Sequence, residues 1–110
     1  MQGKSKAITF IGFAVRAGKI KCGVNALLLT KERIKVLILC STAGENTSKE
    51  SIKLSKRFNC PLLICKDITL ENIINKENCK LAGIYDNNLA KAVLDNIDSN
   101  FLKYFGGDNI

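Results

Sequence analysis

The sequence predicts an α/β fold, in which one central sheet lies between two layers of helices. Segments with apolar residues at helical spacing alternate with short, nearly continuous apolar runs that are typical of buried strands. This alternation favours a three-layer α/β/α sandwich with a mostly parallel or mixed sheet of about four strands. The chain has 110 residues, close to the commonest domain size, and no linker-like segment divides it. We therefore expect a single domain over residues 1–110, with an ordered core over residues 4–98 and a frayed C-terminal tail.

The N-terminal quarter predicts a helix, a short strand and a second helix. The first helix is expected over residues 4–17, because apolar residues recur at helical spacing after Ser5 and the pattern stops at Gly18. A short strand over residues 20–22 and a helix over residues 23–31 follow. The buried side of this second helix is assigned to Leu27, Leu28 and Leu29.

The middle of the chain predicts the central strand and a long helix. The strand over residues 34–40 contains an apolar run without polar alternation, so we expect it to be buried on both faces. A helix over residues 45–58 follows and ends at Asn59. Its cap is assigned to Asn46, Thr47 or Ser48 and its inward side to Ser51, Ile52, Leu54, Ser55 and Phe58.

The C-terminal half continues the alternation of strands and helices. Pro61 stands at an allowed position before a strand over residues 62–65. A short helix over residues 69–74 and a last strand over residues 81–85 come next. The final helix is assigned a cap at Asp86 or Asn87 and an inward side made of Leu89, Ala90, Val93, Leu94, Ile97 and Phe101.

Positive charge is concentrated in the first half of the chain. Residues 1–57 hold twelve Lys and Arg against three Asp and Glu, a balance of +9, while residues 58–110 hold five against seven, a balance of −2. The two halves sum to the net charge of +7. Such asymmetry is typical of proteins that bind polyanions, although basic residues also occur on ordinary solvated surfaces.

The segment over residues 16–25 contains the most informative pattern. Its three cations, Arg16, Lys19 and Lys21, alternate with small or apolar residues. Gly23 and Asn25 follow where a helix is expected to begin, so cationic side chains lie beside backbone donors. This combination suits contact with the phosphates of a nucleic-acid backbone.

The cysteines predict free thiols in a reducing compartment. There are five of them, none in a CxxC pair, and the chain has no histidine. We therefore expect no metal site, no redox nucleophile and no cofactor. No apolar run is long enough to span a membrane and the first residues do not resemble a signal peptide. We expect a monomeric cytoplasmic protein with no membrane partner.

Gly18-Lys19-Ile20-Lys21, with Gly23, Asn25 and a buried strand further on, resembles the kink-turn-binding ribosomal protein family. These are the large-subunit proteins of the seven-Ae and thirty-e kind, with a small bacterial YlxQ-like branch. The element order over residues 4–98 is similar, and Gly44-Glu45-Asn46-Thr47 resembles the turn after the second strand of that branch. The resemblance implies a three-layer α/β/α fold and non-catalytic binding of bent, structured RNA, in particular ribosomal RNA in a ribonucleoprotein.

The family's helix opening reads Gly, any residue, Asn and Glu, with a Lys three places after that Glu. Gly23 and Asn25 match this pattern, whereas Ala26 replaces the Glu and Leu29 the Lys. Glycine lets an RNA backbone approach closely, and the asparagine amide can pair with an exposed purine edge. Because Ala26 cannot accept hydrogen bonds from guanine, we expect weaker base readout with phosphate contacts retained. Leu29 is expected to pack inward.

The family's second contact is an apolar, glycine-containing loop before the last strand. This chain has residues 70–76 there, with Glu71 and Asn75 departing from the glycine pattern. Ile73 or Ile74 can pack against an unstacked base, although at least one of them is expected in the core. The RNA-binding residues assigned from the sequence are Lys19, Lys21, Gly23, Asn25, Lys31, Arg33, Ile74, Asn75 and Lys76.

Two other classes of function stay open. One is a small-molecule-binding or enzymatic α/β domain that uses the strand-end residues Ser41, Asp67 and Asp86. The chain has no GxGxxG, no GxxxxGK[ST] loop and no histidine base, so we assign no catalytic residue. The other is a protein-interaction module that uses the apolar segment 101–105.

Overall fold

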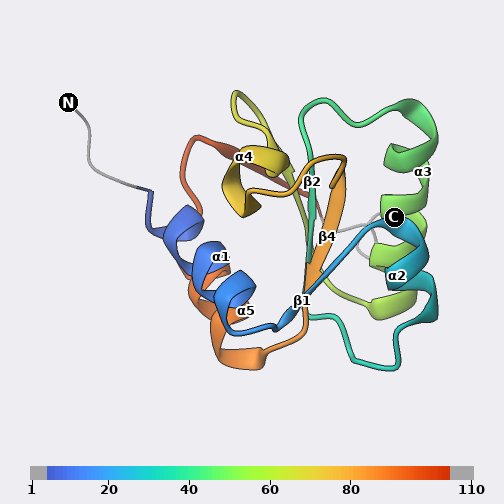
Figure 1. Ribbon diagram of the computed structural model, residues 1–110, viewed down its shortest axis with the longest axis horizontal. Helices are drawn as coiled ribbons and strands as arrows, with labels where there is room; N and C mark the ends of the chain where they lie inside the picture. The colour runs from blue at the N-terminus through green and yellow to red at the C-terminus, as the bar shows by residue number, and fades with distance from the viewer. Residues whose placement is uncertain (1–4, 105–110) are drawn as a thin grey trace.

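The computed structural model describes residues 5–104. Helices and strands alternate along the whole of this range (Figure 1). In chain order the elements are α1 (Lys6–Arg16), β1 (Ile20–Cys22), α2 (Val24–Leu29), β2 (Val36–Leu39), α3 (Glu45–Phe58), β3 (Leu62–Cys65), α4 (Leu70–Ile74), β4 (Leu81–Ile84), α5 (Asn87–Asp95) and β5 (Phe101–Tyr104).

The strands form one mixed sheet in the order β1-β4-β2-β3-β5. Only β2 and β3 run parallel, whereas β1 with β4, β2 with β4 and β3 with β5 are antiparallel. The register places Ile38 opposite Ala82 on one side and Leu63 on the other. The predicted α/β sandwich is thus confirmed with a mixed sheet, and β1 and β5 are its two edges.

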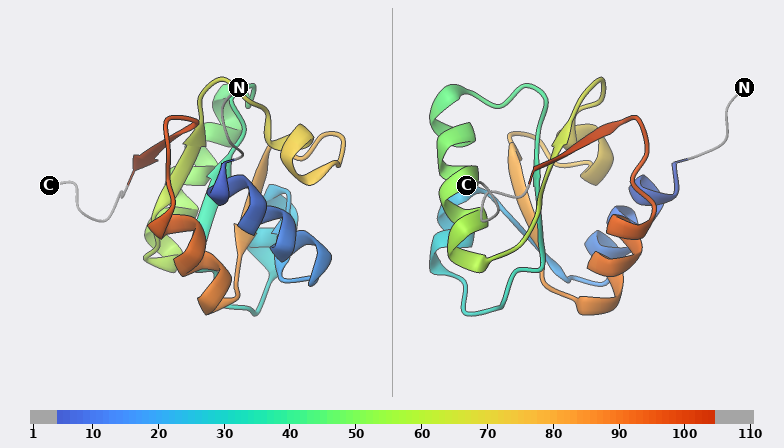
Figure 2. Two further views of the ribbon diagram at one scale, coloured as in Figure 1. Left: turned by 90° about the vertical axis from the view of Figure 1, so that its left-hand side faces the viewer. Right: turned by 180° about the vertical axis from the view of Figure 1, so that it is seen from behind.

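The helices cover both faces of the sheet, as Figures 1 and 2 show, with α1, α4 and α5 on one face and α2 and α3 on the other. Strand β2 is fully buried between them, as the sequence predicted. Its residues Val36 and Ile38 belong to the core on the α1 side, whereas Leu37 and Leu39 belong to the core on the α2 side. The sheet therefore separates two apolar cores.

The C-terminal strand β5 was not predicted. Helix α5 ends at Asp95, and Phe101 is a buried residue of the sheet opposite Cys65 rather than part of a helix. A turn redirects the chain, because the Asp98 carboxylate accepts the backbone N–H of Asn100 at 3.0 Å. The ordered core thus extends beyond residue 98, and the sheet has five strands instead of about four. The tail from Phe105, predicted to fray, lies outside the described residues.

Most helix ends follow the sequence, with one exception. Ser5, Thr69 and Asp86 cap α1, α4 and α5 through their side chains, and Asn59 ends α3 with a positive φ of 54°. Helix α3 instead begins after Gly44, without a side-chain cap. The predicted caps at Asn46, Thr47 or Ser48 were therefore wrong, because these residues already lie inside the helix.

Helix α2 buries fewer leucine side chains than predicted from its sequence. Leu27 is fully buried, but Leu28 is 41% exposed and Leu29 is 81% exposed. Three consecutive residues point to different sides of a helix, so one leucine faces the sheet and Leu29 points to solvent. The expectation that Leu29 packs inward was wrong. Ile52 of α3, also assigned to the core, is exposed.

Candidate functional site

The turn between α1 and β1 is fixed from both sides. Gly18 has a φ of +70°, and its N–H donates to the Val15 carbonyl oxygen at 3.1 Å, so it ends the helix as predicted. Tyr85 holds the turn against β4, since its hydroxyl donates to the Gly18 carbonyl oxygen at 2.6 Å. Its backbone N–H also donates to the Lys19 carbonyl oxygen at 3.1 Å. Tyr85 therefore holds Gly18 and Lys19 against the end of β4.

The two lysines of the segment over residues 16–25, Lys19 and Lys21, have different surroundings. Lys19 is exposed and lies directly before β1. Lys21 is half-buried, and its ammonium nitrogen lies 5.6 Å from the centroid of the Tyr85 ring, within the range of a cation–π contact. Tyr85 was not predicted to take part in the site, because it meets Lys21 only through the pairing of β1 with β4.

Gly23 connects β1 directly to α2. Its φ of +96° suits glycine, and a Cβ there would meet no atom within 4 Å, so the space above it is open. Its N–H donates to the Leu81 carbonyl oxygen at 2.7 Å, which anchors the start of the helix on β4. Asn25 is exposed in the first turn of α2, beside the half-buried Ala26. A partner can therefore approach this backbone closely and reach the Asn25 amide.

The loop between α4 and β4 lies next to the end of β1. Lys76 is close enough to influence the Cys22 thiol electrostatically, and Asn75 and Lys76 are both exposed. This loop therefore lies near Cys22, the residue before Gly23. Ile74 does not join them, because it is only 5% exposed and belongs to the core on the α1 side. The assignment of Ile74 to an RNA contact does not fit this burial.

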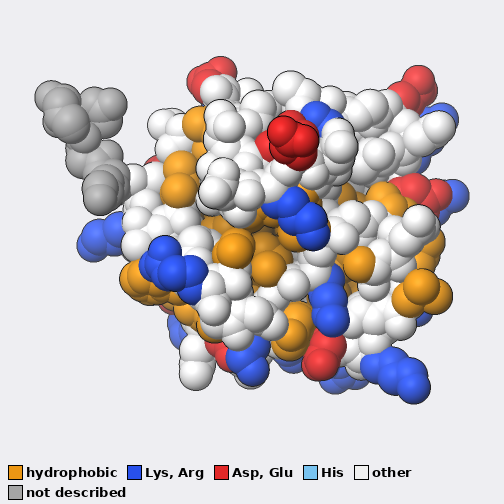
Figure 3. Space-filling model, in the orientation of Figure 1, with side chains coloured by type: hydrophobic (Ala, Val, Ile, Leu, Met, Phe, Trp, Pro, Cys, Tyr) orange, Lys and Arg blue, Asp and Glu red, His pale blue; other side chains and the backbone are white. Residues whose placement is uncertain are grey.

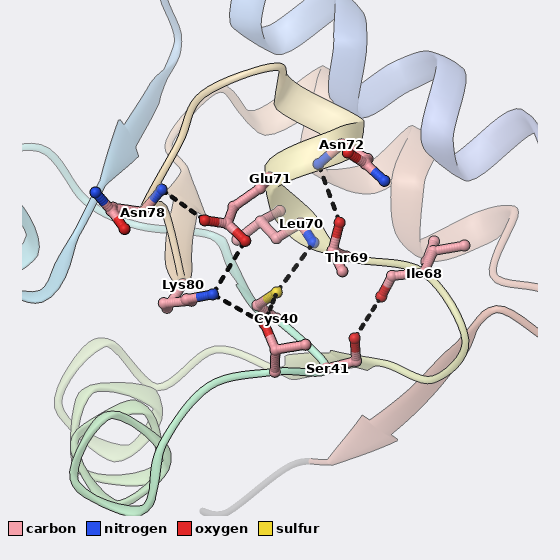
Figure 4. A network of polar contacts seen from close by, with 10 residues as sticks. Cys40, Ser41, Ile68, Thr69, Leu70, Glu71, Asn72, Asn78 and Lys80 are labelled. Carbon is pink, nitrogen blue, oxygen red and sulfur yellow. Dashed lines mark hydrogen bonds and ion pairs between the residues drawn. The ribbon is translucent and has the colours of Figure 1, made fainter.

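Glu71 braces the same loop through its carboxylate (Figure 4). Its carboxylate accepts the Asn78 backbone N–H at 2.6 Å and the Lys80 ammonium at 3.0 Å. Lys80 also donates to the Thr42 hydroxyl at 2.9 Å. The hydrogen bonds from Lys80 and Asn78 hold the pKa of Glu71 below its ordinary value. Glu71, one of the two residues that depart from the family's glycine pattern, therefore holds the loop in place.

Lys31 and Arg33 lie at the other end of the sheet. Their loop joins α2 to β2, and at its end the Lys35 N–H donates to the carbonyl oxygen of Ile84, the last residue of β4. Gly23, in contrast, bonds to Leu81, the first residue of β4. A cavity of about 540 Å³ opens at this end. Its lining includes four cations, Lys31, Arg33, Lys35 and Arg57, with Glu32 as the single acid. Lys35 and Arg57 were not selected from the sequence.

We call these residues the basic track. It includes Lys76 and Asn25 near the end of β1, Lys21 on β1, Lys19 directly before β1, and the four cations Lys31, Arg33, Lys35 and Arg57 that line the cavity at the other end of the sheet. Figure 3 shows Lys and Arg side chains distributed over the face on which β1 lies, with apolar atoms between them. The track defined by these residues contains cations and hydrogen-bonding groups suited to a polyanion.

A comparison with known proteins identifies the family. The chain is 30% identical over 98 residues to the RNA-binding protein YlxQ of Enterococcus faecium, a match that covers 86% of this chain and 94% of that protein. The chain belongs to the YlxQ family. No family model matches the sequence.

A solved structure shares the fold of this YlxQ family member. A protein of unknown function from Bacillus halodurans superposes with a TM-score of 0.68 at 22% identity, over 84% of this chain and 96% of that one. At this identity the similarity concerns the fold alone. Within residues 5–104, no helix is long and apolar enough to cross a membrane.

The alternative enzymatic site is not assembled in this family member. Ser41 and Asp67 follow the parallel strands β2 and β3, but Asp86 follows the antiparallel strand β4 and so lies at the opposite end of the sheet. The Ser41 hydroxyl donates to the Ile68 carbonyl oxygen at 2.7 Å, and the Asp86 carboxylate caps α5 by accepting the Leu89 N–H at 2.9 Å. In the described part of the chain, no three acidic or cysteine side chains are grouped so that they can hold a metal ion.

Proposed function

We propose that this YlxQ family member is a non-catalytic RNA-binding protein that contacts structured RNA through the basic track. The observation that carries the proposal is the convergence of β1, the start of α2 and the α4–β4 loop. Gly23 is anchored on Leu81 of β4, and Lys76 of the α4–β4 loop is close enough to Cys22 to act on its thiol electrostatically. The name of the Enterococcus relative supports the same class of partner.

The track contains the two kinds of group that RNA recognition needs. Lys19, Lys21 and Lys76 provide cations for phosphates, which position the RNA without specifying its sequence. Gly23 leaves open space for close approach of the backbone, and the exposed Asn25 amide can donate to and accept from a base edge. The site therefore combines strong phosphate attraction with a single polar base-reading side chain.

Selectivity for a kink-turn is the finer part of the proposal. Ala26 provides no carboxylate for a guanine edge, so base readout is weaker than the kink-turn-binding family's pattern implies. Leu29 is 81% exposed where that pattern has lysine, so an apolar side chain meets the solvent there. We propose a preference for bent, structured RNA, ribosomal RNA in particular, that depends mainly on shape and phosphates.

The cavity at the far end extends the contact. Lys31 and Arg33 with Lys35 and Arg57 attract a second stretch of backbone, since four cations surround one acid there. An RNA that follows the edge strand β1 reaches both ends of the sheet. We propose that the protein acts as a monomer in the cytoplasm and associates with the ribosome.

A salt titration of RNA binding tests the proposal. Each phosphate contact contributes a slope of about 0.7 to 0.9 in log affinity against log salt. Lys19→Ala with Lys21→Ala should reduce this slope and weaken binding to all RNAs alike. Arg33→Ala with Arg57→Ala should reduce it for an RNA long enough to reach the cavity, and less for a short hairpin.

The matched control removes two cations elsewhere. Lys6 and Lys66 are exposed and lie at the start of α1 and after β3, outside the basic track. Lys6→Ala with Lys66→Ala changes the net charge equally and should leave most of the slope intact. A flat titration of the wild type, or an equal loss in this control, would overturn the proposed surface.

A further inference from the structure

Two cysteines that are far apart in the sequence meet beneath the basic track. Cys22 is the last residue of β1, and Cys79 precedes β4, the neighbouring antiparallel strand. The pairing of the two strands places Cys22 opposite Ala82, three residues after Cys79, and both cysteines pack in the apolar core on the α1 side of the sheet. Cys79 is only 3% exposed and its thiol lies 3.7 Å from the Leu81 carbonyl oxygen, whereas Cys22 is half-buried and reachable from solvent. The pair therefore has one accessible and one sheltered sulfur.

The surroundings of the pair make Cys22 the more reactive thiol. The interaction with the Cys79 thiol, aided by the Lys76 ammonium, lowers the pKa of Cys22 to about 7, against the opposing effect of burial. The same interaction with Cys22, together with burial, raises the pKa of Cys79. Because the thiolate is the attacking species, the exposed Cys22 reacts first with an oxidant.

The other three cysteines lack this combination. Burial raises the pKa of Cys60 and of Cys65 to about 12. Cys40 is buried, and its sulfur accepts the Leu70 backbone N–H at 3.2 Å. None of these three is as accessible as Cys22. They serve as internal controls for any reaction at the pair.

We propose that Cys22 and Cys79 form a reversible disulfide, with Cys22 as the attacking thiol and Cys79 as the resolving thiol. With hydrogen peroxide as oxidant, the Cys22 thiolate attacks one oxygen, the O–O bond breaks and hydroxide leaves, so that Cys22 becomes a sulfenic acid. The Cys79 sulfur then attacks the Cys22 sulfur, the S–S bond forms and the S–O bond breaks. The departing hydroxide accepts the thiol proton of Cys79 and leaves as water. The two sulfurs lose two electrons to the peroxide, and a small thiol reverses the step by exchange.

The backbone around the pair is already held in place for this bond. Gly23, next to Cys22, bonds to Leu81 of β4, and Glu71 braces the loop that leads into Cys79. The disulfide would join the β1–α2 connection to the α4–β4 loop. These are the two segments proposed to contact RNA. An effect of oxidation on RNA affinity therefore rests on the proposed function. Formation of the disulfide itself does not rest on it.

The test uses the full-length reduced protein without RNA. After brief treatment with equimolar hydrogen peroxide, remaining thiols are blocked with N-ethylmaleimide and peptides are mapped by mass spectrometry. We expect a Cys22–Cys79 link that dithiothreitol removes, with Cys40, Cys60 and Cys65 blocked by maleimide. Cys22 should react about tenfold faster than any of these three.

Single variants separate the two roles. Cys79→Ser should leave Cys22 as a sulfenic acid that dimedone traps, and Cys22→Ser should abolish the rapid reaction. Cys60→Ser, as the control, should leave the link unchanged. A link that involves another cysteine, a link between two chains, or maleimide on both Cys22 and Cys79 would overturn the proposal. Because the wild-type map gives this answer alone, a variant that fails to fold does not weaken the test.

Discussion

The Glu71 carboxylate accepts the Asn78 backbone N–H at 2.6 Å and so ties helix α4 to the loop before β4. The same carboxylate pairs with Lys80, which reaches on to Thr42 after β2. Asn75 and Asn78 both have positive φ, so the loop is tightly turned around this carboxylate. The α4–β4 half of the proposed RNA site depends on an intramolecular charge.

This bond predicts a pH-dependent contribution to stability. The pKa of Glu71 is lower in the folded protein than its ordinary value of 4.5, so its contribution is fully present above that value and is lost as pH falls through the lower folded pKa. Glu71→Gln should lower the midpoint of thermal unfolding at pH 7, and this difference should shrink as the pH falls below 4.5. Glu77→Gln in the same loop is the control. Equal effects of the two variants at pH 7 would contradict the role of Glu71.

Gly83 in β4 predicts a steric requirement. A Cβ at this position would lie 2.8 Å from side-chain atoms of both Ile34 and Leu27, closer than carbon atoms pack. Gly83→Ala should therefore displace α2 and lower the free energy of unfolding by about 1 to 3 kcal/mol. Chemical denaturation measures this loss.

Gly12 provides the opposite case within the same protein. It lies inside α1, and a Cβ there would meet no atom within 4 Å. Gly12→Ala should stabilise the protein by about 0.5 to 1 kcal/mol, because alanine has the higher helix propensity. If both glycine variants changed stability in the same direction, crowding at Gly83 would not be the cause.

The elements that the sequence predicted well are those specified by local patterns. Helix α3 spans Glu45–Phe58 and β1 spans Ile20–Cys22, as apolar spacing and end signals indicated. Strand β5 was missed because Phe101 continues the helical spacing of α5, while its real partner is Cys65 in β3. The antiparallel direction of β4 is also a non-local property.

The same distinction applies to the candidate site. Gly18 was predicted correctly as the end of α1, and Gly23 lies at the start of α2, where a helix was expected to begin. Both have a positive φ, which glycine tolerates. The contacts of Tyr85 with Gly18 and of Cys22 with Cys79 were not predicted, because they join residues that only strand pairing brings together. Leu29 was misplaced because apolar character alone does not determine which side of a short helix faces the core.

Cys22 predicts a chemical footprint of the bound RNA. Its pKa of about 7 means that its alkylation by iodoacetamide should accelerate with pH and reach half its maximum near pH 7. Because Cys22 adjoins Gly23, a saturating structured RNA should slow this alkylation, whereas a poly-glutamate of similar charge should slow it less. Unchanged alkylation with RNA bound would place the contact elsewhere on the protein.

Ala26 and Leu29 predict how readout of a kink-turn can be regained. Ala26 lies in the first turn of α2 beside Asn25, so Ala26→Glu places a carboxylate where a guanine edge can donate to it. Leu29 is 81% exposed, so Leu29→Lys should fold normally and add a phosphate contact. A bidentate base contact is worth about 1 to 3 kcal/mol of discrimination. Ala26→Glu should therefore raise the ratio of kink-turn to plain-duplex affinity, while Leu29→Lys should raise both affinities together.

Binding of the wild type and each variant to the two RNAs, at one salt concentration, measures these two effects. If the wild type already prefers the kink-turn strongly and Ala26→Glu abolishes the preference, the alanine belongs to a different mode of recognition and the proposed weakened site is wrong.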